Sequence, residues 1–222
     1  MTLEKNSSLS GIYRRHSAEV TEITGWRIAE HFGSPEKETE HLRNQCVLVD
    51  WSHLGKISLS RGNATEVAEK AIKGAGKIEI LSSLCSEDAA ALRLTRSDYL
   101  FLCDPGAEEQ YLKKMNQKQT TVIDQTGAMA CFALAGPRRD EVLERSTAVD
   151  LRRDRVRSGA VLQSTIHTVS FTLYRTAELE ILVHPRAYSE FLFDALVDVG
   201  MGVGMIPAGI GTLPVSLQKE AS

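Results

Sequence analysis

Two stretches of the sequence follow one order of residues: VLVDWSHLGKISLSRGNATEVAEK at positions 47–70 and TVIDQTGAMACFALAGPRRDEVLER at positions 121–145. When the second stretch is laid on the first, Asp50 aligns with Asp124. Identity is low, but the patterns occur in the same order in both stretches. The sequence therefore predicts an internal duplication, because self-similarity at a fixed offset is typical of repeated structural units.

The pattern extends beyond these stretches. Pro105 in YLFLCDPGAEEQYL aligns with Pro185 in LEILVHPRAYSEFL. Local signals predict the same elements in each half: residues 56–60 alternate apolar and polar side chains as a strand does, and Asn63 is a favourable N-cap for the helix after them. The expected strands are 46–50, 56–60, 77–81, 89–94 and 99–103, then 122–125, 129–135, 161–164, 168–174 and 179–183; helices are expected from Asn63, after Pro105, from Pro137 and from Pro185 to Gly200.

The predicted fold class is α+β. Separate halves of this length would bury little apolar surface, so we expect one domain of two intertwined ββαβββα halves. The predicted organisation is an N-terminal extension with a short helix (1–44), a duplicated domain (45–205, halves about 45–117 and 118–200), and a Gly- and Pro-rich loop and tail (206–222). The short helix is expected to begin at Ser34-Pro35-Glu36, where an N-cap precedes a proline and an acid.

Composition excludes several classes of protein. The chain has 222 residues with 26 Lys+Arg and 29 Asp+Glu, a formal net charge of -3. Nucleic-acid binding needs a basic face, and a membrane span needs an apolar run of about 18 residues; the sequence shows neither. The first residues, MTLEKNSSLSG, lack an apolar signal segment, so a cytoplasmic location is expected.

The four cysteines predict no metal site. Cys46, Cys85, Cys103 and Cys131 are widely spaced, with no CxxC pair. Each lies in an apolar stretch, where cysteine behaves as a small hydrophobic residue. They fit a protein of a reducing compartment.

Three places in the sequence carry polar groups of interest. His53 follows Ser52, which could suggest a nucleophilic Ser–His pair. Adjacent residues point in different directions, however, so a histidine in a turn between two strands is the simpler interpretation. Glu87 and Asp88 precede an apolar strand. They could include a general base, or they could lie in a solvated hairpin turn. Glu180 lies in LEILV, on a solvated sheet face or in a ligand pocket, and period-2 alternation leaves both open.

The N-terminal run resembles the glycine-cleavage T-protein (aminomethyltransferase) family. ITGWRIAEHFGSPEKETEHLRNQCVLVDWSHLGKI, at positions 23–57, is similar to that family's GW…YGS…E…HL…R…LxDxSHxGK pattern. The second half, at 122–175, resembles the gamma subunit of heterotetrameric sarcosine oxidase, which is similar to the same folate-binding domain. The resemblance covers roughly residues 11–211 and implies two intertwined β2αβ3α halves.

The resemblance also implies a tetrahydrofolate site. In the family's Gly-Gly-x-x-Asp-Asp segment the second acid lies nearest the folate's reacting nitrogen, and Asp88 occupies that place here. It implies that Asp88 is catalytic, acting on a developing iminium by proximity and electrostatics. The implied folate-binding residues are Leu54, Leu100, Leu102, Asp104 and Glu180. On this basis Asp88 and Glu180 are expected on the walls of one central cavity.

The chain departs from the family pattern in three ways. Leu213 stands where the family has a substrate-side arginine, the T-G-Y-T-G-E turn before Glu180 is absent, and the family's C-terminal β-barrel is expected to be missing because the sequence stops at Ser222. The K-G-C-x-x-G-Q motif of the iron–sulfur-assembly branch is also absent.

These features leave three hypotheses. The first is a tetrahydrofolate-binding, aminomethyltransferase-like enzyme of one-carbon metabolism that uses a small amine-derived donor. The second is a non-catalytic, gamma-like subunit of an amine-oxidising complex, with a protein partner where the missing domain would pack. The third is a free-standing folate domain with a binding or assembly role.

Overall fold

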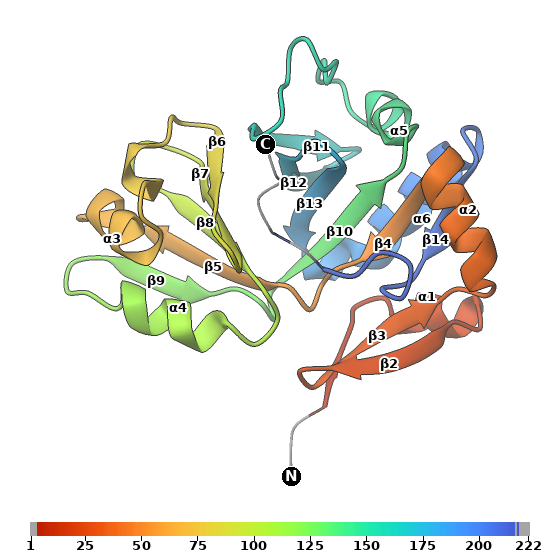
Figure 1. The fold of residues 1–222 in the computed structure, drawn as a ribbon, viewed down its shortest axis with the longest axis horizontal. Coiled ribbons are helices and arrows are strands. Elements are labelled where there is room, and N and C mark those ends of the chain that lie inside the picture. The colour runs from red at the N-terminus through yellow and green to blue at the C-terminus, as the bar shows by residue number, and fades with distance from the viewer. Residues whose placement is uncertain (1–3, 216, 218–222) are drawn as a thin grey trace.

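The segment between Asp50 and Gly55 carries the chain from one β-sheet into another. Strand β4 (Cys46–Asp50) ends in a six-stranded sheet, and β5 (Gly55–Ser60) begins in a five-stranded sheet (Figure 1). A computed structural model describes residues 4–215 and residue 217 of the chain. Residues 1–3, 216 and 218–222 of the predicted extension and tail lie outside the described residues. The fold class is α+β, as the sequence predicts.

The two sheets have related strand orders. The six-stranded sheet runs β11-β12-β13-β10-β4-β14 and the five-stranded sheet runs β6-β7-β8-β5-β9. The remaining strands of the first are β10 (Met129–Ala135), β11 (Val161–Ile166), β12 (Val169–Arg175), β13 (Leu179–Pro185) and β14 (Met205–Ala208). Those of the second are β6 (Ser82–Cys85), β7 (Ala89–Arg93), β8 (Tyr99–Cys103) and β9 (Thr121–Asp124).

Each sheet contains one strand from the other half of the chain: β4 lies beside β10, and β9 lies beside β5. Strand β4 pairs antiparallel with β10, with Val49 opposite Ala133, and β9 pairs with β5, with Val122 opposite Leu59. The two sheets therefore cannot separate without breaking backbone ladders.

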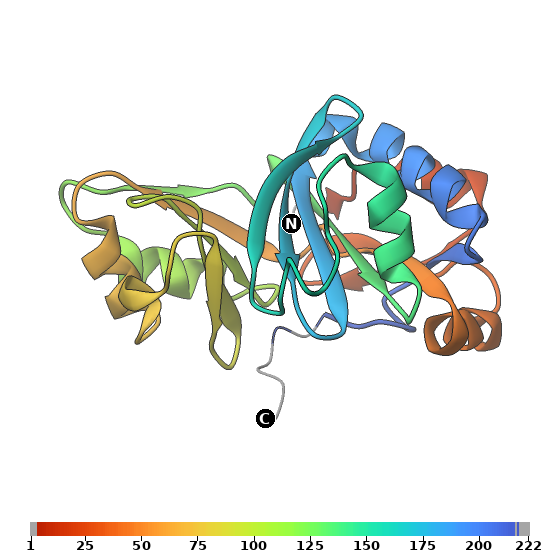
Figure 2. The same cartoon turned by 90° about the horizontal axis from the view of Figure 1, so that it is seen from above.

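Helices cover the outer faces of both sheets. Helices α3 (Ala64–Ala71) and α4 (Glu108–Met115) pack on the five-stranded sheet, and α5 (Arg139–Ser146) and α6 (Ser189–Met201) pack on the six-stranded sheet, as the views in Figures 1 and 2 show. A third buried cluster lies between the two sheets and joins their inner faces. A 3-10 turn (Arg186–Tyr188) leads into α6.

The N-terminal segment is more structured than the sequence predicts. The expected short helix is present as α2 (Pro35–Asn44), with the Ser34 hydroxyl accepting a hydrogen bond from the Lys37 amide. Before it the chain forms β1 (Lys5–Asn6), α1 (Ser10–Arg15), β2 (Glu19–Ile23) and β3 (Trp26–His31), a small sheet that the sequence analysis missed. None of the helices in the described part of the chain is long and apolar enough to cross a membrane.

The expected strand at 77–81 is wrong. Residues Ala75–Lys77 form a 3-10 turn, and Glu69 accepts hydrogen bonds from the amides of Gly74 and Gly76. Leu81 has a φ of 61°, so the backbone cannot continue as a strand there. The strand in this region is β6, which begins at Ser82, directly after Leu81.

The expected loop and tail at 206–222 is also wrong in part. Residues Met205–Ala208 form β14, which pairs in parallel with β4. Pro207 is compatible with this position because β14 is an edge strand, where a missing amide hydrogen leaves no neighbour unpaired. The free edge of β4 supplies the partner, and local sequence patterns do not reveal that edge.

A buried carboxylate ties the N-terminal segment to the crossover. Asp50 accepts hydrogen bonds from the Tyr13 hydroxyl (2.5 Å), from the Ser52 amide (2.8 Å) and from the Ser7 hydroxyl. All four residues are buried. The carboxylate therefore holds α1 and its approach against the end of β4.

Tyr13→Phe tests this contact. The substitution is expected to lower the free energy of unfolding by about 1.5–3 kcal/mol, since it removes a hydrogen bond to a charged group. Urea denaturation measures the change, with Tyr188→Phe at a half-exposed tyrosine as the matched control, expected within about 0.5 kcal/mol of wild type. Equal effects of the two substitutions would contradict the role of Asp50.

Candidate functional site

A hollow opens at one end of the cluster between the two sheets. It has a volume of about 540 Å³. Its lining is largely apolar and aromatic, with Trp51, Tyr174 and Leu179 on the side of the six-stranded sheet and Leu84 on the other side. We call this space the groove hollow. Binding sites for flat heterocycles are typically apolar and aromatic with a few polar groups at fixed places.

The predicted wall residues meet in the cluster beneath this hollow. Leu54, Leu100 and Leu102 are buried and belong to the same apolar cluster as Trp51. They do not line the groove hollow themselves. The three predicted leucines therefore lie together in the buried cluster beneath the groove hollow, and not on its surface.

A second hollow, of about 370 Å³, lies on the other side of Pro214. His53 lines it together with Pro105 and Ile210. The His53 side chain is almost fully buried and its Nδ1 has no hydrogen-bond partner among the described residues. Burial lowers the pKa of His53 to about 4, so the imidazole is neutral at pH 7. We call this space the His53 hollow.

Asp88 and Asp104 lie together in a third, more open hollow beside α3 and α4. The Tyr111 hydroxyl donates to Asp88 Oδ1 (2.6 Å), and the Asp104 amide donates to the Asp88 carbonyl (2.9 Å). Burial, and then the Asp88 charge, raise the pKa of Asp104. Cys85 lines both this hollow and the groove hollow, and its Sγ lies 2.7 Å from the Tyr174 hydroxyl.

Glu180 lies on the opposite face of the six-stranded sheet. Along β13, Leu179, Ile181 and Val183 face the cluster between the sheets, whereas Leu182 faces the helices. Strand alternation places Glu180 with Leu182. The expectation that Asp88 and Glu180 share one cavity is therefore wrong.

Glu180 is instead committed to an internal ion pair. Arg175 Nε donates to Glu180 Oε1 (2.7 Å), and both side chains are fully buried. Arg175 also donates to the carbonyls of Leu151 (2.6 Å) and Val156 (3.0 Å), which holds the loop before β11. Burial raises the pKa of Glu180 to about 7, and the Arg175 charge opposes that rise.

The sequence analysis missed Glu178. This exposed carboxylate lies in the short turn between β12 and β13 and lines the groove hollow. The Glu178 amide donates to the Thr176 hydroxyl (3.2 Å), which fixes the turn. Its position in the sequence could have indicated this role. Glu178 precedes Leu179, the first residue of β13, so the strand alternation that turns Glu180 away from the groove does not apply to Glu178.

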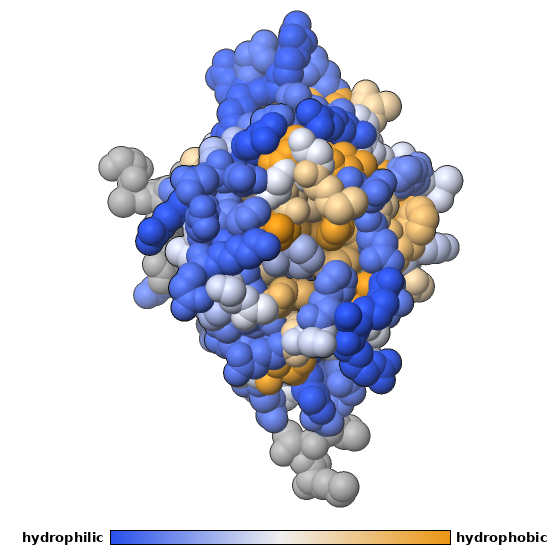
Figure 3. All heavy atoms as spheres, turned by 90° about the vertical axis from the view of Figure 1, so that its right-hand side faces the viewer, coloured by the Kyte–Doolittle hydropathy of each residue, from blue (hydrophilic) through white to orange (hydrophobic). Residues whose placement is uncertain are grey.

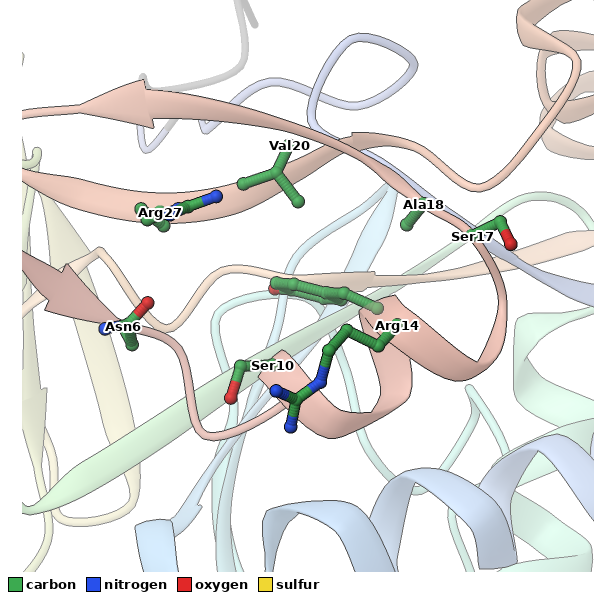
Figure 4. Close-up of a pocket in the computed structure, with 8 residues that line it drawn as sticks. Asn6, Ser10, Arg14, Ser17, Ala18, Val20 and Arg27 are labelled. Atoms are coloured by element: carbon green, nitrogen blue, oxygen red, sulfur yellow. The ribbon is translucent and has the colours of Figure 1, made fainter.

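Another hollow lies at the N-terminal segment, far from the predicted residues. Figure 4 shows it between α1 and the β2–β3 hairpin, with Ser10 and Arg14 from the helix and Val20 and Arg27 from the strands. Arg27 pairs with Glu4 (3.3 Å) at the surface. No predicted site residue lines this hollow. Within residues 4–215 and 217, no group of three or more His, Cys, Asp or Glu side chains is arranged to hold a metal ion.

Glu180→Gln tests the buried pair through pH. Between pH 4.5 and about 7 the unfolded chain has released the Glu180 proton while the folded chain retains it, so rising pH destabilises the folded wild type. The difference in unfolding free energy should shift in favour of the variant across this range, by at most about 3 kcal/mol. Urea denaturation at pH 5 to 8 measures it, with Glu190→Gln as control. A difference that stays constant with pH would contradict the raised pKa.

Comparison with known proteins identifies the family. Residues 9–219 match the family described as the GCVT N-terminal domain. Aminomethyltransferases from Geobacillus thermodenitrificans and Halothermothrix orenii are 27% and 26% identical, over 93% of this chain and 61% and 62% of their own lengths. The chain thus spans about three fifths of these curated relatives.

Two solved structures share the fold. The glycine cleavage system aminomethyltransferase T from Bartonella henselae superposes with a TM-score of 0.77 at 19% identity, over 94% of this chain and 60% of that one. A chain of heterotetrameric sarcosine oxidase from Corynebacterium sp. U-96 gives a TM-score of 0.63 at 15% identity, over 89% and 95% of the two chains. The match over nearly the whole sequence shows that the chain belongs to the GCVT N-terminal domain family.

Proposed function

We propose that the protein binds a reduced folate in the groove hollow and takes part in aminomethyl-type one-carbon transfer. The observation that carries the proposal is the apolar and aromatic lining between the sheets, with the Glu178 carboxylate in the same lining. A pterin ring is flat and presents adjacent N–H donors, which a carboxylate accepts in a charge-assisted, bidentate geometry. Several relatives are named aminomethyltransferases, which supports this class of reaction.

Asp88 is the proposed catalytic residue in this scheme. Transfer of an aminomethyl carbon to a folate nitrogen builds positive charge on an iminium unit, and a nearby carboxylate stabilises that charge. Tyr111 fixes the orientation of Asp88, and Asp104 lies beside it. Their hollow adjoins the groove hollow at Cys85, so a donor bound beside Asp88 would lie next to a ring held in the groove.

We further propose that the domain arose by duplication, with halves at about 45–117 and 118–200. The strand orders support this. In β6-β7-β8-β5-β9 and in β11-β12-β13-β10-β4, the last three strands of one half lie beside its second strand, followed by the first strand of the other half.

A second candidate function is that of a non-catalytic subunit in an amine-oxidising complex. The similarity to a chain of a heterotetrameric sarcosine oxidase favours it. Phe191 and Met201 on α6 are more than half exposed. The side of the molecule where α2 and α6 lie has hydrophobic atoms at its centre with hydrophilic ones around them (Figure 3). Exposed apolar patches of this kind mark contact surfaces for other proteins.

Calorimetric titration with folinic acid, a stable reduced folate, separates the two candidates. The wild type should bind, and Glu178→Gln should weaken binding roughly tenfold, the worth of about 1.5 kcal/mol from a hydrogen bond to a charged group. Glu190→Gln, an exposed carboxylate on α6, is the matched control and should bind as wild type does. No heat and no thermal stabilisation at millimolar folinic acid would contradict folate binding and favour the second candidate.

A further inference from the structure

The segment after β14 crosses the groove between the two sheets. Its first part is firmly anchored: the amides of Ile210 and Gly211 donate to the carbonyls of Ala29 and Glu30 on β3 (3.0 Å each). The Gly209 amide and the Thr212 hydroxyl both donate to Glu38 (3.0 and 2.8 Å). Glycine is required at 209, because a Cβ there would collide with the Glu30 carbonyl oxygen.

The next residues, Leu213, Pro214, Val215 and Leu217, are held differently, and we call them the strap. Leu217 is 4% exposed and belongs to the apolar cluster between the sheets, while Leu213 and Val215 pack against that cluster. The indole N–H of buried Trp51 donates to the Leu213 carbonyl (3.0 Å). Among the described residues, no backbone amide or carbonyl beyond Leu213 joins the strap to the sheets.

The strap divides the groove. Leu213, Pro214 and Leu217 line the groove hollow, whereas Pro214 and Val215 line the His53 hollow on the other side. Pro214 is common to the two linings, so the strap lies between the two hollows. The strap therefore forms one wall of the groove hollow and covers Trp51, which is fully buried.

We propose that the strap is an intramolecular competitor for the Trp51 end of the groove, and that a ligand ring reaches the Trp51 indole only when the strap lifts. This inference rests on the proposed folate site and adds its regulation. A flat heteroaromatic ring with an acceptor at its edge replaces both functions of the strap. The face of the ring covers the apolar cluster, and its acceptor receives the hydrogen bond that the Trp51 indole otherwise donates to the Leu213 carbonyl. The anchored residues 209–212 act as the hinge, since their hydrogen bonds to β3 and α2 do not depend on the strap.

The difference in attachment explains why this segment can move. The anchored residues 209–212 are held by directed hydrogen bonds. A segment opens locally more easily when few such bonds hold it. The strap is held to the sheets by apolar contacts and by the hydrogen bond from Trp51, and the Leu213 amide donates back to the Gly209 carbonyl of the anchor (3.2 Å). A ligand shifts such an equilibrium only by the difference in its affinity for the two states, and in the strap-closed state the Trp51 indole N–H is already bonded to the Leu213 carbonyl.

Strap variants of the full chain test the competition. Leu217→Asp places a charge in the apolar cluster, so the strap should lift and folinic acid should bind at least tenfold more tightly than to wild type by calorimetry. Val215→Asp, at a less buried position, should have the same effect in direction and serves if Leu217→Asp fails to fold. Met201→Asp, at a 62% exposed residue on α6, is the control and should leave affinity unchanged. Unchanged or weaker binding in both strap variants would overturn the proposal.

Hydrogen exchange in the wild type gives an independent readout. Saturating folinic acid should speed exchange in the peptide that covers residues 209–215, because the strap leaves the groove. Slower exchange there would mean that the strap closes over the ligand, which overturns competition while leaving the folate site intact.

A ligand-free measurement separates this inference from the folate site. The chain has two tryptophans, so Trp26→Phe leaves Trp51 as the sole reporter. Acrylamide quenching of Trp51 should rise at least twofold when Leu217→Asp is added. Unchanged quenching would contradict the strap itself. Increased quenching with no folinic acid binding in any variant would contradict the proposed function and, with it, the competition.

Discussion

The burial of a lysine side chain at the crossover between the two sheets constrains the rest of the fold. Lys56 is fully buried, and its Nζ donates to the carbonyls of Ser52 (2.9 Å) and Leu54 (2.5 Å). Burial lowers its pKa, while the nearby Asp50 charge is among the groups that oppose that change. A buried amine needs hydrogen-bond partners such as these two carbonyls, so the crossover backbone must fold into one arrangement. The Ser52 hydroxyl accepts from the Cys131 amide (3.2 Å), which fixes the crossover against β10.

The crossover determines where chemistry is possible. Because β4 and β5 leave it in different sheets, the inner faces of these sheets meet in an apolar cluster, and a hollow remains on either side of Pro214. Apart from Glu178 in the groove lining, the charged groups of the predicted site lie elsewhere: Arg175 and Glu180 on the helix-covered face, Asp88 beside α4. The groove is consequently suited to a flat, largely apolar ring rather than to a polyanion.

Much of the fold follows from local patterns in the sequence. The strands at Cys46–Asp50, Met129–Ala135 and Tyr99–Cys103 have the predicted bounds, because apolar runs flanked by turn residues specify them without tertiary information. The segment at 77–81 has the same kind of pattern, but Glu69 captures two amides of the preceding turn and delays the strand. Strand β14 depends on the free edge of β4, which no local pattern contains.

The candidate site was less predictable for a related reason. Alternation along β13 correctly separates Glu180 from Leu179 and Ile181, but it does not say which face lies toward the groove. That depends on the partner sheet and on Arg175, which lies directly opposite Glu180 on the neighbouring strand β12 and donates a hydrogen bond to it. The positions of Asp88 and Asp104 side by side follow from β7 pairing with β8, with Ala89 opposite Cys103.

A crystal structure of the protein grown with folinic acid tests the central claim most directly, because it locates the ligand without reference to activity. The groove site predicts electron density for the pterin ring against Trp51, with the Glu178 carboxylate at its N–H edge and the strap displaced. Density in the hollow between α1 and the β2–β3 hairpin, or a ligand-free groove with the strap still bonded to Trp51, would contradict it.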